Sequence, residues 1–270
     1  MRARKRDAWP VTVPETTQLR VTARKGVHDA CLLVGLVALM SSVMLFLLVE
    51  YQGYSIALLL LPGSAKRADM SEAELPYFLS THTFLFIGGP HRGGTTLLWR
   101  LLASHADVSA FPETTGDSDF SEGVFLQSVL PTFGVGQESR RPRHQLDGLG
   151  RFAFSASAHL TESSPLNSAA SSLVLSREWA FYWNLSRRVL LEKTPSNMLT
   201  SRLLQALLAP SAKFIFISRH PVAVALAHQQ WRECARDPLS QLTLHWVISH
   251  LILAHDRPRL AAARIVRYEG

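Results

Sequence analysis

The sequence predicts an α/β fold: a P-loop-like open parallel sheet flanked by helices and preceded by one transmembrane helix. Three features predict it. Short, wholly apolar segments recur from residue 80 onward, as in strands that are buried on both faces. Segments with helical spacing separate them. One uncharged run of nineteen residues lies near the N-terminus.

The N-terminal segment is expected to anchor the chain in a membrane. Residues 1–30 hold seven Lys and Arg against three Asp and Glu, and residues 31–49 carry no charge. Nineteen residues at about 1.5 Å each nearly span a hydrocarbon core of about 30 Å. Because the basic flank of such a segment stays in the cytosol, we expect a cytosolic tail over 1–30 and a type II signal-anchor over 31–49. A cleaved signal peptide or an organelle transit peptide is the alternative.

The remainder is expected to divide into a stem over 50–79, which is polar and bounded by prolines over 62–76, and one domain over 80–270. The net charge of +7 comes mostly from the basic tail, and the basic stretches lack interleaved aromatic residues. Nucleic acid is therefore not an expected partner. The only cysteines, Cys31 and Cys234, predict neither a disulfide framework nor a cysteine metal site.

The domain is expected to alternate strands with helices, as a parallel sheet requires. The predicted strands are 84–88, 107–111, 188–193, 213–218 and 264–268. The predicted helices are 95–104, 121–129, 169–183, 196–208, 221–232 and 239–255. Thr194 is expected to cap the helix that follows it, with Pro195 at the first helical position.

A glycine-rich loop joins the first predicted strand to the first helix. Gly89 to Thr96 (GPHRGGTT) has the length of a phosphate-binding loop, G-x-x-x-x-G-K-[ST], but Thr95 stands in the lysine position and Arg92 lies inside the loop. Glycines let backbone N–H groups approach an anion, and the helix that starts near Thr95 directs its positive end to the same place. The loop therefore predicts an anion site.

Three more polar groups follow the next strands. Glu113 comes after the second strand, Lys193 ends the third, and Arg219 follows the fourth. Ligands of open parallel sheets bind beyond the carboxyl ends of the strands, so these groups are expected to surround the loop. Each alone has an ordinary interpretation, as a loop carboxylate, a solvated strand end or a surface charge. Their occurrence at matching strand ends favours a site.

The loop does not suit a nucleoside triphosphate with magnesium. In triphosphatases the loop lysine neutralises the β- and γ-phosphates, and the metal is held by the next Ser or Thr and by an Asp. Here the lysine is absent and no apolar strand ends in a lone aspartate. No metal is therefore expected at this site, and a small-molecule P-loop kinase is the least favoured function.

The motifs resemble those of sulfotransferases that use 3′-phosphoadenylyl sulfate (PAPS), in the membrane-bound, Golgi-type branch. PHRGGTTLLWRLL is similar to their 5′-phosphosulfate loop, and FIFISRHPVAVALA is similar to their 3′-phosphate segment. LLEKTPSN resembles the lysine–proline element and VRYEG the strand after it, so the likeness covers residues 84–269. Sulfuryl transfer in this family needs neither a γ-phosphate nor magnesium, which accounts for the missing lysine.

The resemblance implies a role for each matching residue. Lys193 and Arg92 would stabilise charge on the transferring group, and Glu113, twenty-one residues after Arg92, would be the general base. Glu122, His159 and Glu162 are reserve candidates for the base, because nothing in the sequence fixes them beside the loop. The donor PAPS would be held by Arg92, Gly93, Gly94, Thr95, Thr96 and Arg219.

Two departures from the family pattern bear on activity. A serine that usually binds the 3′-phosphate is replaced by Ala227. A lost hydrogen bond to a charged group is worth ~1.5–3 kcal/mol, or roughly 10- to 100-fold in affinity, unless another group such as His228 substitutes. The chain also ends at Gly270, directly after a predicted strand, whereas the family continues with segments that close over the cofactor. A C-terminally truncated product is therefore one interpretation.

The preferred function is transfer of a sulfuryl group from PAPS to an acceptor hydroxyl in the lumen of the Golgi. Carbohydrate, protein tyrosine and lipid are the acceptor classes, with carbohydrate preferred. A non-catalytic nucleotide-binding or scaffold protein derived from a sulfotransferase is the alternative, favoured by Ala227 and the early chain end. The stripe Trp179, Tyr182 and Trp183 is assigned to the core, and Trp231 and Trp246 to packing.

Overall fold

The computed structural model describes residues 68–113, 122–135 and 147–270. The predicted tail, the predicted anchor over 31–49 and most of the predicted stem lie outside these residues. Within the three described ranges, every helix falls short of the length and apolarity that a membrane crossing requires.

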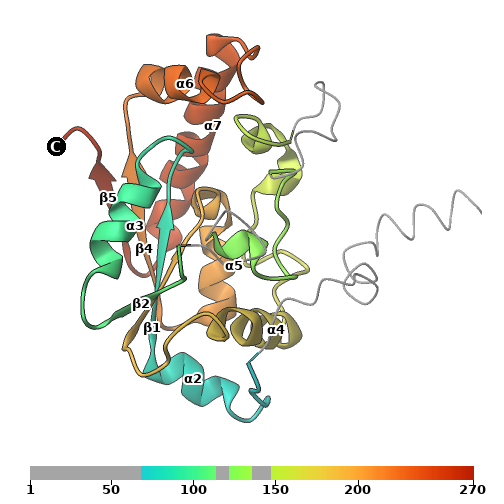
Figure 1. Cartoon of the computed structure of the whole chain (residues 1–270). Helices are drawn as coiled ribbons and strands as arrows, with labels where there is room; N and C mark the ends of the chain where they lie inside the picture. The colour runs from blue at the N-terminus through green and yellow to red at the C-terminus, as the bar shows by residue number, and fades with distance from the viewer. Residues whose placement is uncertain (1–67, 114–121, 136–146) are drawn as a thin grey trace, which may run out of the picture. The chain divides into compact units, whose positions relative to one another are not determined.

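Five parallel strands form the centre of the domain, in the order β2–β3–β1–β4–β5 (Figure 1). Each begins and ends within one residue of its predicted bounds, so the prediction of an open parallel sheet is confirmed. The register places Ile87 of β1 beside Lys193 of β3 and Ile215 of β4. The strands are β1 (Thr83–Gly88), β2 (Val108–Ala110), β3 (Val189–Lys193), β4 (Ala212–Ser218) and β5 (Ala263–Arg267).

Helices cover both faces of the sheet, because successive side chains of a buried strand point to opposite sides. On one face Ile87 packs with Trp99 of α3 (Thr95–Ala103). On the other, Phe84 and Phe86 pack into a larger core with three helices. These are α4 (Ala169–Ala180), α5 (Asn197–Leu208) and α7 (Leu239–Asp256).

Two further helices complete the described part. α6 (Pro221–Gln229) follows β4 and packs on α7, with Pro221 at its first turn as its sequence predicts. α2 (Leu75–Thr81) begins inside the predicted stem, yet Phe78 is buried and its ring contacts that of Phe84, with ring centroids 5.3 Å apart. The folded domain therefore begins before residue 80.

The aromatic stripe on α4 and just after it belongs to the core, as predicted. Trp179 and Trp183 are buried, and Trp183 stacks on Phe111 with ring centroids 4.9 Å apart. Tyr182 is partly buried at the edge of the same cluster. Trp183 and Trp179 also contact Phe84 and Phe86 of β1, so the stripe is part of the core under the sheet.

Two local predictions are wrong, for the same reason. The segment predicted as a helix over 121–129 forms only a 3₁₀ turn, η1 (Gly123–Phe125), within its described residues. α5 begins at Asn197 rather than Pro195, and Thr194 does not cap it. In both places backbone and side-chain donors bond to the carboxylate of Glu192 or to Thr194 instead of continuing a helix.

Candidate active site

A cavity of about 1040 Å³ lies beyond the carboxyl ends of the strands. Every predicted site residue except Gly93 lines it. Gly93 is buried in the loop, where its N–H donates to the carbonyl of Pro90 at 2.9 Å. The predicted residues in the lining are Arg92, Gly94, Thr95, Thr96, Glu113, Lys193, Arg219 and Ala227.

The loop between β1 and α3 directs backbone N–H groups toward this cavity. Arg92 and Gly94 both have left-handed backbone conformations, with φ of 61° and 100°. A Cβ at Gly94 would lie 2.5 Å from the ring of Tyr268, so only glycine fits there. The N-cap residue of α3, Gly94, has no side chain to cap it, and the first N–H groups of a helix have no acceptor inside it. This end of α3 can therefore bind an anion.

Arg92 and Arg219 are held in place without a carboxylate. The Arg92 guanidinium lies over the Trp231 ring at 4.8 Å and its Nε donates to the carbonyl of Ala227 at 3.3 Å. The Arg219 guanidinium lies over Tyr268 at 4.5 Å and donates to the Arg92 carbonyl at 3.0 Å. In the described part of the chain neither forms an ion pair, so both keep N–H donors for an anion.

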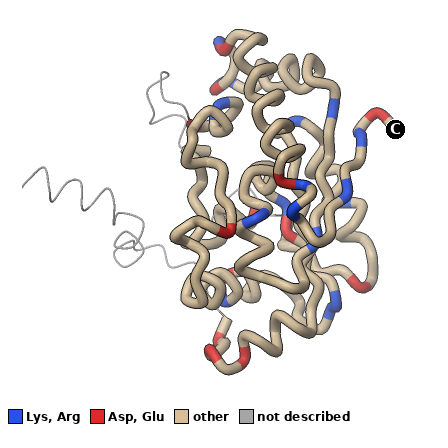
Figure 2. Tube along the Cα trace, turned by 180° about the vertical axis from the view of Figure 1, so that it is seen from behind, with Lys and Arg blue, Asp and Glu red and all other residues tan. Residues whose placement is uncertain are grey.

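Lys193 and Glu122 form an ion pair on the cavity wall. The Lys193 Nζ donates to Glu122 Oε1 at 2.7 Å, and the two side chains are only 6% and 11% exposed. In Figure 2 the acidic and basic positions are interspersed over the domain. From the sequence, Glu122 is only a reserve candidate for the general base. The structure places its carboxylate against the Lys193 ammonium.

The neighbouring carboxylate of Glu192 explains why Glu122 lies there. Its Oε1 accepts the N–H of Gly123 at 2.8 Å, and the N–H of Val124 donates to Thr194 at 3.2 Å. A Cβ on Gly123 would lie 2.5 Å from the Glu192 side chain. In the sequence, the glycine directly after Glu122 is the one sign of this close approach to Glu192. A glycine alone does not show which residue it will contact.

Glu113 occupies a different setting. It lines the cavity, but its side chain is 62% exposed and pairs with Arg100 of α3, whose side chain is equally open to solvent. It is therefore a carboxylate of the cavity edge, whereas Glu122 is buried beside Lys193. The structure brings both to one cavity and gives them different environments.

The surroundings of Ala227 differ from the sequence expectation. Ala227 contributes its carbonyl, which accepts from Arg92. His228, proposed as a substitute for the missing serine, is buried, is absent from the cavity lining and directs Nδ1 to the Val224 carbonyl at 3.0 Å. Trp231, assigned to packing, instead lines the cavity beneath Arg92, together with Gln230.

The other candidates fall outside this cavity. His159 and Glu162 bond to Asp256 and Arg202 respectively and are absent from the lining. Trp246, as predicted, has a packing role, and its indole N–H donates to the Arg219 carbonyl at 3.0 Å.

Buried imidazoles pack around the loop residue His91. His91 lines the cavity, and its ring contacts those of His228 and Trp231. Burial lowers the pKa of His91 well below its ordinary value and that of His245 to about 3, so both are neutral at pH 7. The His91 Nδ1 is buried without a partner among the described residues, and it is a hydrogen-bonding group that a bound anion or ligand can satisfy.

The Glu192 carboxyl predicts an unusual pH dependence of stability. Burial raises its pKa from 4.5 to about 7, although hydrogen bonds from Thr194, Asn197 and Gly123 oppose the rise. Between these values the folded chain holds a proton that the unfolded chain has released. The Glu192 contribution to stability therefore falls as pH rises through this window, by roughly 3 kcal/mol.

Glu192→Gln should remove this fall, because an amide does not titrate here. Urea unfolding followed by circular dichroism between pH 4.5 and 8 measures it. As pH rises through the window, the free energy of unfolding of Glu192→Gln should increase by roughly 3 kcal/mol relative to that of wild type. The control Glu72→Gln, at an exposed position, should follow wild type. Parallel pH profiles for wild type and Glu192→Gln would contradict the prediction.

Comparison with known proteins supplies the family. The sulfotransferase family model matches residues 85–269. Two solved structures are similar, each with a TM-score of 0.39. One is the sulfotransferase domain from the curacin biosynthetic pathway (19% identity, 70% of this chain and 67% of that one). The other is the sulfotransferase domain from the Synechococcus PCC 7002 olefin synthase (22% identity, 69% and 66%). The chain thus spans about two thirds of each domain's length.

No curated protein matches the chain. The family match nevertheless extends over far more than half of the sequence and includes the loop, Lys193 and Arg219. This chain belongs to the sulfotransferase family.

Proposed function

We propose that this chain transfers a sulfuryl group from PAPS to the hydroxyl of an acceptor. The observation that carries the proposal is the cavity itself, which unites the open N-terminus of α3, four cationic side chains and a buried carboxylate. Such a set suits a phosphosulfate, which is anionic. When its sulfuryl group is transferred, the phosphate left behind carries more negative charge than it did in the phosphosulfate.

The donor would be held by the loop and by the two stacked arginines. Backbone N–H groups at the start of α3, with Thr95 and Thr96, are suited to the 5′-phosphosulfate. Arg219 is our candidate for the 3′-phosphate. Ala227 lacks a hydroxyl, and the polar side chains in the lining near it include those of Arg92, Gln230 and Glu233.

The reaction would move one sulfuryl group and one proton. The acceptor oxygen forms a bond to sulfur while the bond from sulfur to the bridging phosphate oxygen breaks. Lys193 would stabilise the charge that appears on that leaving oxygen. The acceptor proton passes to a carboxylate that must lie within hydrogen-bond reach of it.

Glu122 is our preferred base, in place of Glu113. It lies 2.7 Å from Lys193, the residue expected at the leaving oxygen, and it is shielded from solvent. Glu113 instead engages Arg100 at the exposed edge. Lys193 would have to turn from Glu122 toward the donor, and this step would free the carboxylate to accept a proton.

The acceptor class, location and topology are inferred from the sequence. We propose a type II protein anchored by residues 31–49, with its domain in the lumen of the Golgi and a carbohydrate as the preferred acceptor over protein tyrosine and lipid. A non-catalytic nucleotide-binding protein is the second candidate, because Ala227 offers only a backbone carbonyl to the site.

The donor proposal predicts nucleotide selectivity. The full chain should bind 3′-phosphoadenosine 5′-phosphate more tightly than AMP or ATP, without a magnesium requirement, in isothermal titration. Arg219→Ala should weaken binding roughly 10- to 100-fold through the lost charged hydrogen bond. Arg188→Ala, at the exposed amino end of β3, is the control and should bind as wild type. Equal affinity for AMP would mean that no group reads the 3′-phosphate.

The assignment of the base predicts a contrast between two glutamates. Glu122→Gln should lower kcat at least ~100-fold while nucleotide affinity stays nearly constant, whereas Glu113→Gln should keep kcat within a few fold. Lys193→Ala should also lower kcat more than binding. The assay follows radiolabelled sulfate from PAPS to a panel of carbohydrate, tyrosine-peptide and lipid acceptors.

Each outcome of this assay has a definite meaning. If kcat falls in Glu113→Gln and not in Glu122→Gln, the general base is Glu113. A wild-type chain that binds the nucleotide but sulfates no acceptor in the panel would favour the non-catalytic alternative. Circular dichroism of each variant separates lost chemistry from lost folding.

The topology proposal predicts which end of the chain a protease reaches. In intact microsomes, added protease should remove only about the first thirty residues. A protected N-terminus would reverse the orientation, and a soluble product lacking the apolar run would mean that the segment is cleaved.

A further inference from the structure

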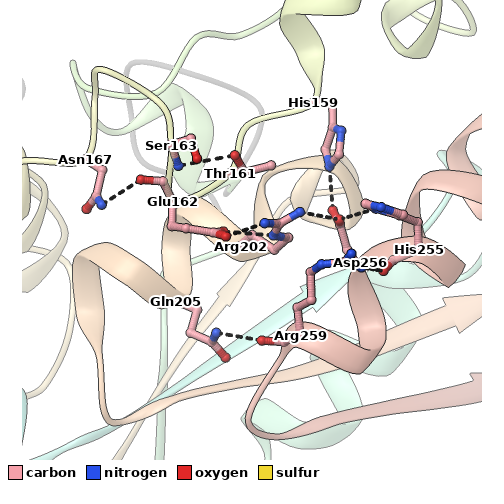
Figure 3. Close-up of polar contacts among 10 residues, drawn as sticks. All are labelled: His159, Thr161, Glu162, Ser163, Asn167, Arg202, Gln205, His255, Asp256 and Arg259. Carbon is pink, nitrogen blue, oxygen red and sulfur yellow. Dashed lines mark hydrogen bonds and ion pairs between the residues drawn. The ribbon is translucent and has the colours of Figure 1, made fainter.

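A second polar cluster lies at the C-terminal end of α7, away from the cavity lining. Figure 3 shows His159, His255, Asp256, Arg202 and Glu162 converging there. His159 lies after the 3₁₀ turn η4 (Ala156–Ala158), and His255 and Asp256 end α7. The cluster thus joins chain segments almost a hundred positions apart.

The two imidazoles face one carboxylate. His159 Nε2 lies 2.7 Å from Asp256 Oδ2, and His255 Nδ1 lies 3.0 Å from Asp256 Oδ1. The three ligand atoms all lie within 4.8 Å of one another. Ligand atoms bound to a tetrahedral Zn²⁺ at about 2.0–2.1 Å are about 3.3 Å apart, so small side-chain movements would admit the ion.

We propose that His159, His255 and Asp256 form a site for a divalent transition metal, with Zn²⁺ as the ion best suited to two imidazoles and a carboxylate. The site is independent of sulfuryl transfer. Water would complete the coordination, because the His255 side chain is 56% exposed and that of His159 is 27% exposed.

The cluster holds two carboxylates, those of Asp256 and Glu162, and two guanidinium groups, those of Arg202 and of Arg259, which donates to the His255 carbonyl. The Asp256 carboxylate is completely buried, and within the described ranges the permanent charge that it pairs with is Arg202, whose Nη1 lies 3.2 Å from its Oδ1. Arg202 directs its Nε, at 2.8 Å, and its Nη2 to Glu162, so it is shared between two carboxylates. The C-terminal end of α7 adds negative potential. Arg202 would also orient the metal-binding carboxylate, as the hydrogen-bonding partners of metal ligands commonly do.

Metal binding would replace the protons that the imidazoles now share with Asp256. The ion would then tie the segment after η4 to the end of α7. This segment already contacts α5 next to Arg202, since the N–H of Leu160 donates to the Leu199 carbonyl at 3.0 Å. A bound ion should therefore stabilise the folded domain.

Zinc titration of the full chain, purified without a histidine tag and freed of metal by a chelator, tests this site. We expect one Zn²⁺ per chain at these residues, a rise in Tm on adding Zn²⁺, and visible absorption bands of bound Co²⁺. His255→Gln should weaken Zn²⁺ binding by at least about tenfold and remove the Tm rise. Because His255 is half exposed, this variant is expected to fold, unlike one that alters the buried Asp256.

Two further variants complete the design. His159→Gln should match His255→Gln, since it removes a ligand from the opposite segment. His105→Gln, an exposed histidine after α3, should keep wild-type affinity and Tm rise. If His255→Gln binds Zn²⁺ as tightly as wild type, or if wild type binds none, the proposal is wrong.

Discussion

The position of the buried Glu192 carboxylate is the constraint on which the cavity depends. It lies at the end of β3 and accepts hydrogen bonds from Asn197, Thr194 and the backbone of Gly123. Asn197 also donates to the Ile87 carbonyl of β1. A single carboxylate thereby connects two strands, the start of α5 and the segment that carries Glu122. Its raised pKa reflects the free energy that burial of this charge costs, and its three donors only partly offset it.

The parallel sheet explains why so many charges gather in one place. All five strands end at the same edge, so the residues that follow them are neighbours in space although they are far apart in sequence. Two of the cations are neutralised there, Lys193 by Glu122 and Arg100 by Glu113. Arg92 and Arg219 are held by aromatic rings and carbonyls instead. The site therefore keeps positive charge where the N-terminus of α3 also favours an anion.

α7 connects the cavity with the histidine–aspartate cluster. In its middle, the Trp246 indole bonds to the Arg219 carbonyl and His250 lies 3.0 Å from the Ser218 hydroxyl. At its end, Asp256 faces His159 and Arg202. One helix thus supports both the strand end that carries Arg219 and the proposed metal site.

The sequence by itself determined the sheet, the glycine-rich turn between β1 and α3 and the strand-end positions of Lys193 and Arg219, because hydrophobic pattern and chain direction place them locally. It did not determine which glutamate accompanies Lys193, since that depends on Gly123 meeting Glu192 sixty-nine positions away. The same holds for η1 in place of a helix and for Trp231 beneath Arg92. The pairing of His159 with Asp256 also required tertiary structure. Each of these is a side-chain or backbone contact between distant segments, and no local periodicity encodes it.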